Sequence, residues 1–273
     1  MGIVVKANGG LGNRMRVLAS CIALHERLRE EVEVLWVNNE ELNCPYNQLF
    51  LPISGLKIKD VKYIPKWNRL GLKLRKKSVY QAFKNYDIQF SDVEIRELKE
   101  MKSDLVKLIR DAKSVFIDTC EAFYGDQSFL AFLIPEKLVN QEIERRLTII
   151  EHSNYMGVHI RRGDNATSIN ISTTSAFISK MKSVVSADIN TIFYLSTDSK
   201  LEVLSLKAAF PNKIVHFPIG LKRNRPSDIR MALVDLLVLS KSKKILGSYW
   251  SSFSEVASAY GGIPLESMGH SER

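Results

Sequence analysis

The regular alternation of short apolar runs with helically spaced segments is the feature that most constrains the fold. Residues 2–7 (GIVVKA) and 155–160 (YMGVHI) are apolar runs, followed by a glycine-rich turn and by two arginines respectively. Such runs are typical of strands buried on both faces. Residues 13–30, 174–185 and 200–210 carry apolar side chains three and four positions apart, as helices that cover a sheet do. The alternation predicts an α/β protein with mostly parallel strands.

The remaining elements follow from the same patterns. We expect a helical stretch over 120–150, broken at Pro135, and no clear pattern over 40–113. Two halves, 1–140 and 141–273, fit this order, although the length also permits one domain with a long insertion. Further strands are predicted at 32–37, 114–119, 191–197, 213–217 and 243–247, and further helices at 227–240 and 253–260.

The basic charge of the chain is concentrated in one segment. Residues 57–84 contain ten basic residues and one acid, which accounts for the whole formal charge of +9. Such a segment suits phosphate-rich partners or an anionic membrane surface, or is simply a solvated loop. A nucleic-acid-binding protein is an alternative, but aromatic residues are sparse in the segment and no recognised motif is present.

The cysteines and the N-terminal sequence indicate the cellular compartment. The three cysteines are widely spaced and contain no C-x-x-C pair, which favours a reducing cytosol and neither a disulfide framework nor a zinc site. No signal peptide and no apolar stretch of about 20 residues is evident. We therefore expect a cytoplasmic protein, with peripheral contact at the inner face of the membrane through 57–84 as a further possibility.

Polar residues follow several predicted strands, at the edge where parallel sheets bind ligands. Gly10 and Gly12 lie in the turn NGGLGNR after the first strand, where exposed amides favour an anion. The spacing is neither G-x-G-x-x-G nor that of a phosphate-binding P-loop, so a tight turn explains these glycines equally well.

The stretch GVHIRRGD ends another strand in two guanidinium groups. Arg161 and Arg162 alternate in direction, so one can reach a ligand while the other pairs with the protein. Asp164 could orient a guanidinium, and His159 lies at the end of the strand. A salt-bridged corner is the alternative. Arginine suits phosphate because its planar fork matches phosphate geometry and keeps its charge.

Two more strand ends and one helix add candidates. The motif STDS contains Asp198 and could instead cap the next helix. The motif SYWSSFSE places Ser251 and Ser252 at a helix start, where they suit phosphate oxygens or form a capping box with Glu255. Asp235 lies in an apolar helix and needs a partner there, unless it occupies a surface position. Together these residues predict a diphosphate-like ligand without a metal site.

The motifs GGLGNR, VHIRRGD, STDS and DLLVLSKSKKILGSYWSSFSEVAS, in this order, resemble the fucosyltransferase superfamily, which includes α1,2-, α1,6- and protein O-fucosyltransferases. The resemblance implies a GT-B fold, in which two Rossmann-like domains face each other across a cleft. It implies an inverting, metal-independent transferase that moves fucose from GDP-fucose to a glycan or lipid-linked oligosaccharide and needs no other cofactor. Residues 1–140 would form the acceptor-side domain, and residues 141–273 would bind the nucleotide sugar.

The resemblance also implies roles for single residues. Arg161 matches the arginine that grips the diphosphate, and His159 matches its neighbour near the nucleoside. Asp235 matches an aspartate that accepts hydrogen bonds from guanine, and Asn13 matches an asparagine near the reacting centre. The remaining nucleotide-binding residues are Gly10, Gly12, Asp198, Ser251, Ser252 and Phe253.

The general base is the point at which the sequence departs from the family. The stretch NATSINIS after Asp164 contains no acid where α1,6-fucosyltransferases carry a glutamate. Asp164 is one candidate base. The alternative is a dissociative displacement driven by the leaving diphosphate. A different nucleotide sugar on the same fold, or a dinucleotide oxidoreductase, are the remaining alternatives.

Overall fold

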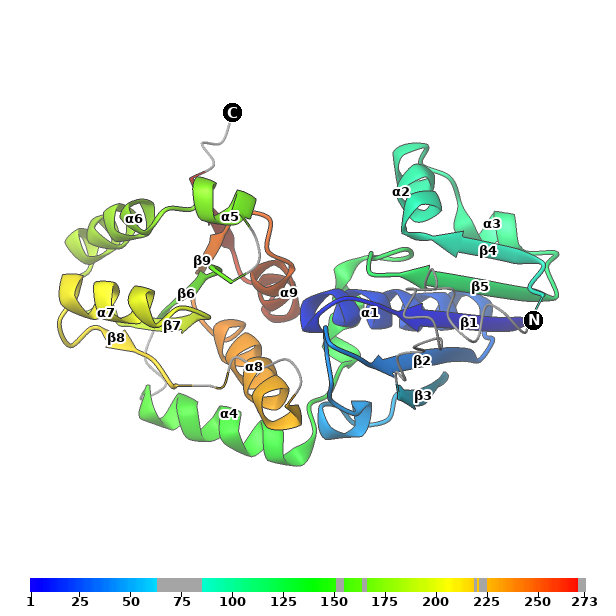
Figure 1. Cartoon of the computed structure of the whole chain (residues 1–273), viewed down its shortest axis with the longest axis horizontal. Coiled ribbons are helices and arrows are strands. Elements are labelled where there is room, and N and C mark those ends of the chain that lie inside the picture. Colours follow the sequence, from blue (N-terminus) through cyan, green and yellow to red (C-terminus); the bar gives the residue numbers. More distant parts are fainter. Residues whose placement is uncertain (63–84, 151–154, 164–165, 219, 221–224, 270–273) are drawn as a thin grey trace, which may run out of the picture. The chain divides into compact units, whose positions relative to one another are not determined.

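The computed structural model describes residues 1–62, 85–150, 155–163, 166–218, 220 and 225–269. The chain divides into two compact units. Unit 1 comprises residues 1–46 and 52–129, and unit 2 comprises residues 47–51 and 130–273. Figure 1 shows the elements of both units. Each unit is an α/β structure built on a parallel sheet of five strands.

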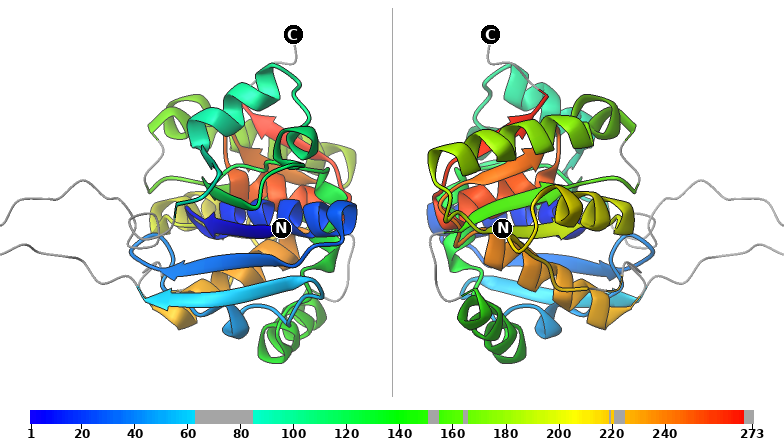
Figure 2. Two further views of the ribbon diagram at one scale, coloured as in Figure 1. Left: turned by 90° about the vertical axis from the view of Figure 1, so that its right-hand side faces the viewer. Right: turned by 90° about the vertical axis from the view of Figure 1, so that its left-hand side faces the viewer.

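Unit 1 is organised around its first strand. The sheet order is β3-β2-β1-β5-β4, with β1 (Gly2–Ala7) between β2 (Val32–Asn38) and β5 (Ser114–Thr119). The edges are β3 (Leu56–Lys62) and β4 (Ile88–Ser91). Helix α1 (Leu11–Leu28) packs against β1, β2 and β3, which lie side by side in the left view of Figure 2. Helices α2 (Asp92–Glu100) and α3 (Leu105–Ile109) connect β4 to β5.

Unit 2 also has its first strand at the centre of the sheet, but its last two strands lie in the opposite order. Its sheet has the order β10-β9-β6-β7-β8, formed by β6 (Met156–Ile160), β7 (Phe193–Thr197), β8 (Ile214–Val215), β9 (Ile245–Ser248) and β10 (Leu265–Met268). Helices α6 (Thr174–Ala187) and α7 (Lys200–Ala209) cover one face, and α8 (Pro226–Leu239) and α9 (Ser252–Gly261) the other, as Figures 1 and 2 show. Helix α4 (Lys137–Ile149) lies beside α8, and the short α5 (Ala166–Ile171) follows β6.

The central strands are as predicted because they are buried on both faces. All five residues of β6 and of β7 are buried. Their apolar side chains form a core with Phe177 and Met181 of α6 and Leu206 of α7. The prediction of an α/β protein with mostly parallel strands is therefore confirmed.

The stretch 120–150 differs from the expected helix. It contains the 3-10 turn η2 (Gln127–Phe132) and then α4. Residues 134–136 between them bond to residues 49–51, through Leu51 N to Ile134 O and Glu136 N to Leu49 O, each at 2.9 Å. This pairing attaches residues 47–51, which include part of the 3-10 turn η1 (Tyr46–Gln48), to unit 2. It also moves the division of the chain to 129/130, earlier than the expected 140/141.

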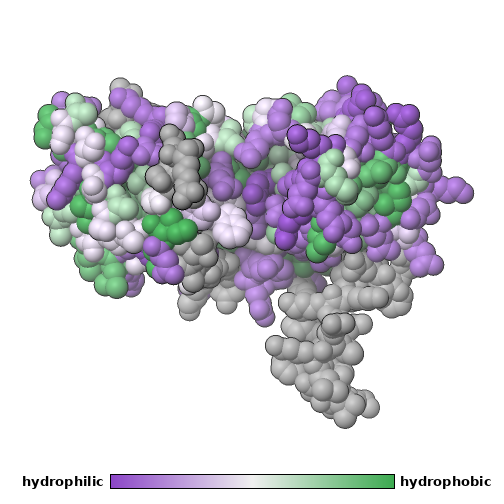
Figure 3. All heavy atoms as spheres, turned by 90° about the horizontal axis from the view of Figure 1, so that it is seen from above, coloured by the Kyte–Doolittle hydropathy of each residue, from purple (hydrophilic) through white to green (hydrophobic). Residues whose placement is uncertain are grey.

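The basic segment falls mostly outside the described residues. Only residues 57–62 of the segment 57–84 are described, and they belong to β3. Exposed apolar side chains such as Val93, Met101 and Leu108 occur near α2 and α3. In Figure 3 hydrophobic residues are interspersed with hydrophilic ones on the face shown. Among the described residues, no helix combines the length and the apolar character needed to cross a membrane.

Candidate functional site

The strand ends of unit 2 meet where the sheet order reverses. After β6 the chain continues through β7 and β8 on one side and returns to β9 and β10 on the other. In open parallel sheets, ligands bind at the carboxyl ends of the strands at such a reversal. Arg161 follows β6, Asp198 follows β7, and Ser251 follows β9. The fold therefore brings three of the predicted residues to one edge of the sheet.

Arg161 is anchored through its backbone and one guanidinium nitrogen. Its amide donates to Ser248 Oγ at 2.9 Å. Its Nη1 lies 3.3 Å from Asp198 Oδ2, and the Arg161 side chain remains 26% exposed. A guanidinium is a planar fork of five N–H donors, a geometry that suits phosphate oxygens. Arg161 therefore remains a candidate for holding an anion.

Asp198 has a structural task that the sequence did not predict. Its carboxylate accepts the backbone amides of Arg162 at 2.7 Å and Gly163 at 2.9 Å. A side chain at Gly163 would lie 2.8 Å from Asp198 Oδ2, which explains the glycine. Asp198 thus fixes the turn after β6 and the direction of Arg161. This geometry supports a positioning role and gives no support to the predicted contact with a nucleotide.

Arg162 points toward the protein, as the alternation of the strand predicts. Its Nε donates to Glu202 Oε1 at 2.7 Å, with side chains only 14% and 8% exposed. Thr174 Oγ1 donates to the same carboxylate oxygen at 2.7 Å. The prediction that one arginine of the pair is used by the protein is confirmed.

His159 is buried and neutral. Its ring stacks on Phe253 with 4.7 Å between centroids and 26° between planes. Burial, and then the nearby Arg161 charge, lower the pKa of His159 to about 3. Within the described chain its Nδ1 has no hydrogen-bond partner. A buried ring nitrogen without a partner is costly, so a polar ligand group beside it would be favourable.

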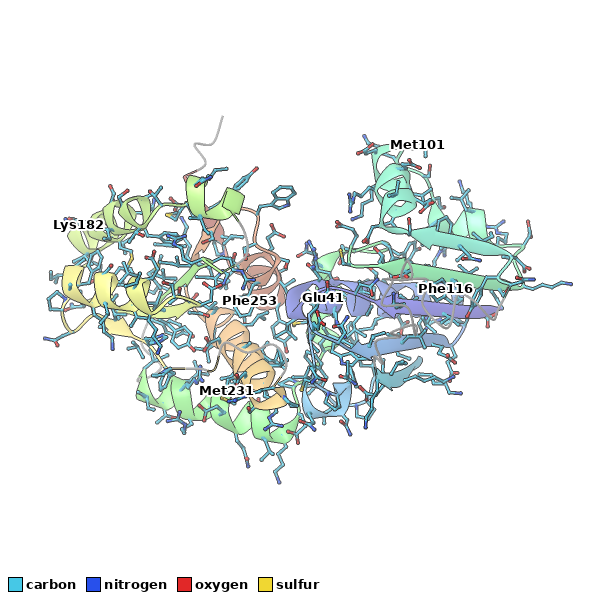
Figure 4. The ribbon with its side chains drawn as sticks, in the orientation of Figure 1. Glu41, Met101, Phe116, Lys182, Met231 and Phe253 are labelled. Carbon is cyan, nitrogen blue, oxygen red and sulfur yellow. The ribbon has the colours of Figure 1, made fainter. Side chains whose placement is uncertain are left out.

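Helix α9 presents its N-terminus beside these residues. Ser251 caps the helix without a side-chain hydrogen bond, and its backbone oxygen accepts from Glu255 N at 3.1 Å. The helix starts at Ser252, so Glu255 is one position too far along for the expected capping box. Figure 4 labels Phe253 at this end of α9. The first amides of a helix lack intrahelical partners and attract anions.

Asp235 has partners in the protein that fill the role predicted for guanine. Its Oδ1 accepts from Arg146 Nη1 and from Tyr194 Oη, the latter at 2.6 Å, and Oδ2 accepts from Ser196 Oγ at 3.0 Å. The residue is 2% exposed, and burial raises its pKa while Arg146 and the two hydroxyls act against the rise. Arg146 also contacts Met231, labelled on α8 in Figure 4. These contacts give Asp235 a structural role in unit 2. The guanine contact expected for it stays a prediction.

The first loop belongs to unit 1. Gly10 caps α1, Gly12 is buried in its first turn, and Asn13 Oδ1 accepts from Arg16 Nη2 at 2.8 Å. Arg14, which the sequence did not indicate, is fully buried and donates to Gly9 O at 2.9 Å and Val37 O at 2.7 Å. Burial lowers the pKa of Arg14 to about 10, against the charges of Glu41 and Asp60, so it stays charged at neutral pH.

The candidate base Asp164 and the STDS motif are the remaining predicted features. Asp164, the candidate base, lies outside the described residues. Ser199 caps α7 by accepting from Glu202 N at 3.4 Å, so the helix-cap explanation of STDS is confirmed for that serine. Throughout the described ranges, no group of three or more histidine, cysteine or carboxylate side chains is arranged to hold a metal ion.

Comparison with solved structures identifies the class of fold, which is that of fucosyltransferases. NodZ α1,6-fucosyltransferase soaked with GDP-fucose superposes with a TM-score of 0.66 at 15% identity, over 99% of this chain and 98% of that one. Fucosyltransferase NodZ from Bradyrhizobium has a TM-score of 0.63 at 16% identity, over 99% and 97%. POFUT1 in complex with GDP has a TM-score of 0.60 at 11% identity, over 98% of both chains.

Sequence comparison adds nothing to this result. No protein-family model matches the chain, and no curated protein matches it either. The shared fold nevertheless extends over nearly the whole length of both partners in each structural comparison. The chain thus has the α/β fold of NodZ and POFUT1.

Proposed function

We propose that the protein is a glycosyltransferase that moves fucose from GDP-fucose to a glycan acceptor. The single observation that carries this proposal is the place of Arg161. Its side chain is partly exposed where the strand order of the sheet reverses, and the N-terminus of α9 follows the neighbouring strand β9. A guanidinium and a helix N-terminus are the two elements that bind a diphosphate through fixed positive charge. The choice of donor is supported by the shared fold of NodZ, whose crystal was soaked with GDP-fucose.

The proposed reaction breaks the bond between the anomeric carbon and the β-phosphate oxygen. The acceptor hydroxyl forms the new bond from the opposite face, with inversion, and gives up its proton. Negative charge grows on the leaving phosphate, where Arg161 and the amides of Ser252 and Phe253 would meet it. Donors fixed in advance at such a point supply several kcal/mol of transition-state stabilisation. We propose that they take the part that a divalent metal plays elsewhere.

The nucleoside would lie beside His159 and Phe253. The stacked pair offers an apolar surface, and the unpartnered Nδ1 of His159 can accept a hydrogen bond because the ring is neutral. Asp198 would act indirectly by holding the turn that carries Arg161. Ser251 and Ser252 would add hydroxyl donors to the phosphate oxygens.

Unit 1 would provide the acceptor side. We propose a GT-B arrangement, with the two units facing across a cleft, in which Asn13 approaches the reacting centre and Gly10 and Gly12 allow close backbone approach. The buried Arg14 supports this proposal because it fixes the loop between Gly9 and the strand end at Val37. Asp164 is the candidate for proton removal. In the alternative, a dissociative displacement driven by the departing diphosphate, the acceptor hydroxyl loses its proton to solvent once the new bond has formed.

A second candidate is the same fold with another nucleotide sugar. The observation that favours it is the network around Asp235, because protein groups engage both carboxylate oxygens of the residue expected to select guanine. Calorimetry with GDP-fucose, GDP-mannose, GDP and UDP, with and without magnesium, tests both. Tight GDP-fucose binding and transfer without magnesium support the first candidate. Preference for UDP supports the second, and strict magnesium dependence contradicts the metal-independent mechanism.

A further inference from the structure

The turn between β9 and α9 carries an unusual tryptophan. Trp250 is 71% exposed, although most tryptophan side chains are largely buried. Its backbone adopts φ 53°, in the left-handed region that bulky residues rarely occupy. Such a conformation persists only where the surroundings impose it, and it occurs preferentially at functional sites. Exposure and strain together point to a binding role for this ring.

The surroundings do impose the conformation. On one side, Ser248 Oγ accepts the amide of Arg161 at 2.9 Å. On the other, the amide of Tyr249 donates to Ser172 Oγ at 2.7 Å, and Ser172 donates to Met268 O at 2.7 Å. Both Ser172 and Ser248 are buried. The turn that presents Trp250 is therefore held by hydrogen bonds of two buried serines to two other segments of unit 2.

Trp250 borders a hollow of mixed chemistry. The hollow is lined by Tyr249, Trp250, Glu255 and Ser267. The rings of Tyr249 and Trp250 lie 6.5 Å apart with 59° between their planes. A pyranose ring has an apolar C–H face that packs on an aromatic ring, and hydroxyl groups that donate to carboxylates and exchange hydrogen bonds with hydroxyls. An aromatic wall with one carboxylate and one hydroxyl matches that combination.

We propose that this hollow binds a pyranose ring of the acceptor glycan, with Trp250 as the stacking surface and Glu255 as a hydroxyl acceptor. The inference rests on the proposed function, because it uses the place of Trp250 directly before Ser251 and Ser252. An acceptor sugar stacked there would lie next to the residues assigned to the leaving phosphate. The strained turn then has a purpose, since it turns the ring outward at the edge of the donor site.

The test uses ligand-observed NMR on the full chain with methyl glycosides of glucose, galactose, mannose, N-acetylglucosamine and fucose. Trp250→Phe keeps a stacking ring, whereas Trp250→Gly removes it and relieves the positive φ. Leu204→Ser changes another apolar side chain, 65% exposed on α7, and is the matched control. GDP affinity, measured by calorimetry in each variant, reports separately on the nucleotide site.

We expect saturable signals from at least one glycoside other than the fucoside. Trp250→Gly should weaken them about ten-fold, because the stacking contribution is lost, with a melting temperature no lower than that of the original protein. Trp250→Phe and Leu204→Ser should keep the signals. If Trp250→Gly binds the glycosides as well as the original protein, or if a protein that binds GDP gives no glycoside signal, the proposed stacking of a pyranose ring on Trp250 is wrong. The proposed function is not affected by either result.

Other outcomes separate the two proposals further. A signal from the fucoside alone would assign the hollow to the donor sugar and overturn the acceptor site. If anionic vesicles bind in a Trp250-dependent way and glycosides do not, the ring is a membrane contact. This result also contradicts the proposed acceptor site. Absence of GDP binding, with Trp250-dependent glycoside binding intact, would contradict the proposed function while confirming a sugar-binding hollow.

Discussion

Arg146 of α4 and Asp235 of α8 form an ion pair in which the two side chains are only 2% and 3% exposed. The pair joins two helices that lie side by side on one face of the unit 2 sheet. Tyr194 of β7 donates to the same carboxylate at 2.6 Å, and burial together with Asp235 raises the pKa of Tyr194 so that it stays protonated. Arg146 also lies 4.7 Å from the centre of the Phe217 ring.

Removal of Asp235 should destabilise unit 2 severely. Asp235→Ala leaves the Arg146 guanidinium buried without its counter-ion, and we expect a loss of about 3–5 kcal/mol in the free energy of unfolding. Urea denaturation measures it. The double variant Arg146→Met/Asp235→Leu removes both charges and should lose less than Asp235→Ala alone. A loss below about 1 kcal/mol for Asp235→Ala, as for an exposed pair, would show that the pair is not the structural element described.

His159 should make the protein sensitive to acid. Its pKa is lowered from 6.5 to about 3 in the folded chain. Between these values the unfolded chain binds a proton that the folded chain does not, so stability is lost as the pH falls through this window. The expected slope from this group is up to about 1.4 kcal/mol per pH unit. Above pH 6.5 the contribution is constant.

The variant His159→Phe keeps a ring against Phe253 and removes the proton. Denaturation of both proteins at several pH values between 4 and 7 isolates the contribution of His159, because all other groups are shared. We expect the two stability curves to diverge with the original protein falling more steeply toward low pH. Parallel curves across this range would show that His159 is protonated alike in both states.

Arg14 should control the first loop of unit 1. Arg14→Lys keeps the charge but loses the fork that reaches Gly9 O, Val37 O and Asn39 Oδ1 together. Hydrogen–deuterium exchange should be about ten-fold or more faster in peptides covering residues 8–14, since each lost charged hydrogen bond costs about 1.5–3 kcal/mol. Peptides covering β6 are the internal control. Unchanged exchange in the loop would contradict this role.

The central strands of both sheets and the edge strand β8 could be predicted, and the edge strands β3, β4 and β10 could not. β1, β5, β6 and β7 are apolar along most of their length because helices cover the faces of the sheets at these central strands. The edge strand β3 reads LKIKDVK and has no fully buried residue, so its lysines hide the pattern. β10 is a similar case at the other sheet. Edge strands often carry charge for this reason.

The site could be predicted where it depends on strand direction and not where it depends on distant partners. Alternation along β6 predicted that one arginine of the pair turns toward the protein, and Arg162 does so. The apolar helix around Asp235 showed that a partner must exist, but Arg146 lies 89 residues earlier in the chain. Nothing local in the sequence marks Arg146 or the buried Arg14, because both are selected by tertiary packing.

The most direct measurement is the affinity for GDP of Arg161→Ala and Arg162→Ala, by calorimetry without magnesium. Arg161 is assigned to the diphosphate, whereas Arg162 is committed to Glu202 at 2.7 Å. We predict that Arg161→Ala weakens GDP binding about 30-fold or more, since a charge-assisted pair is lost. Arg162→Ala should change it by less than about three-fold, within the range of indirect effects. Equal GDP affinity in Arg161→Ala and the original protein would contradict the proposed diphosphate site.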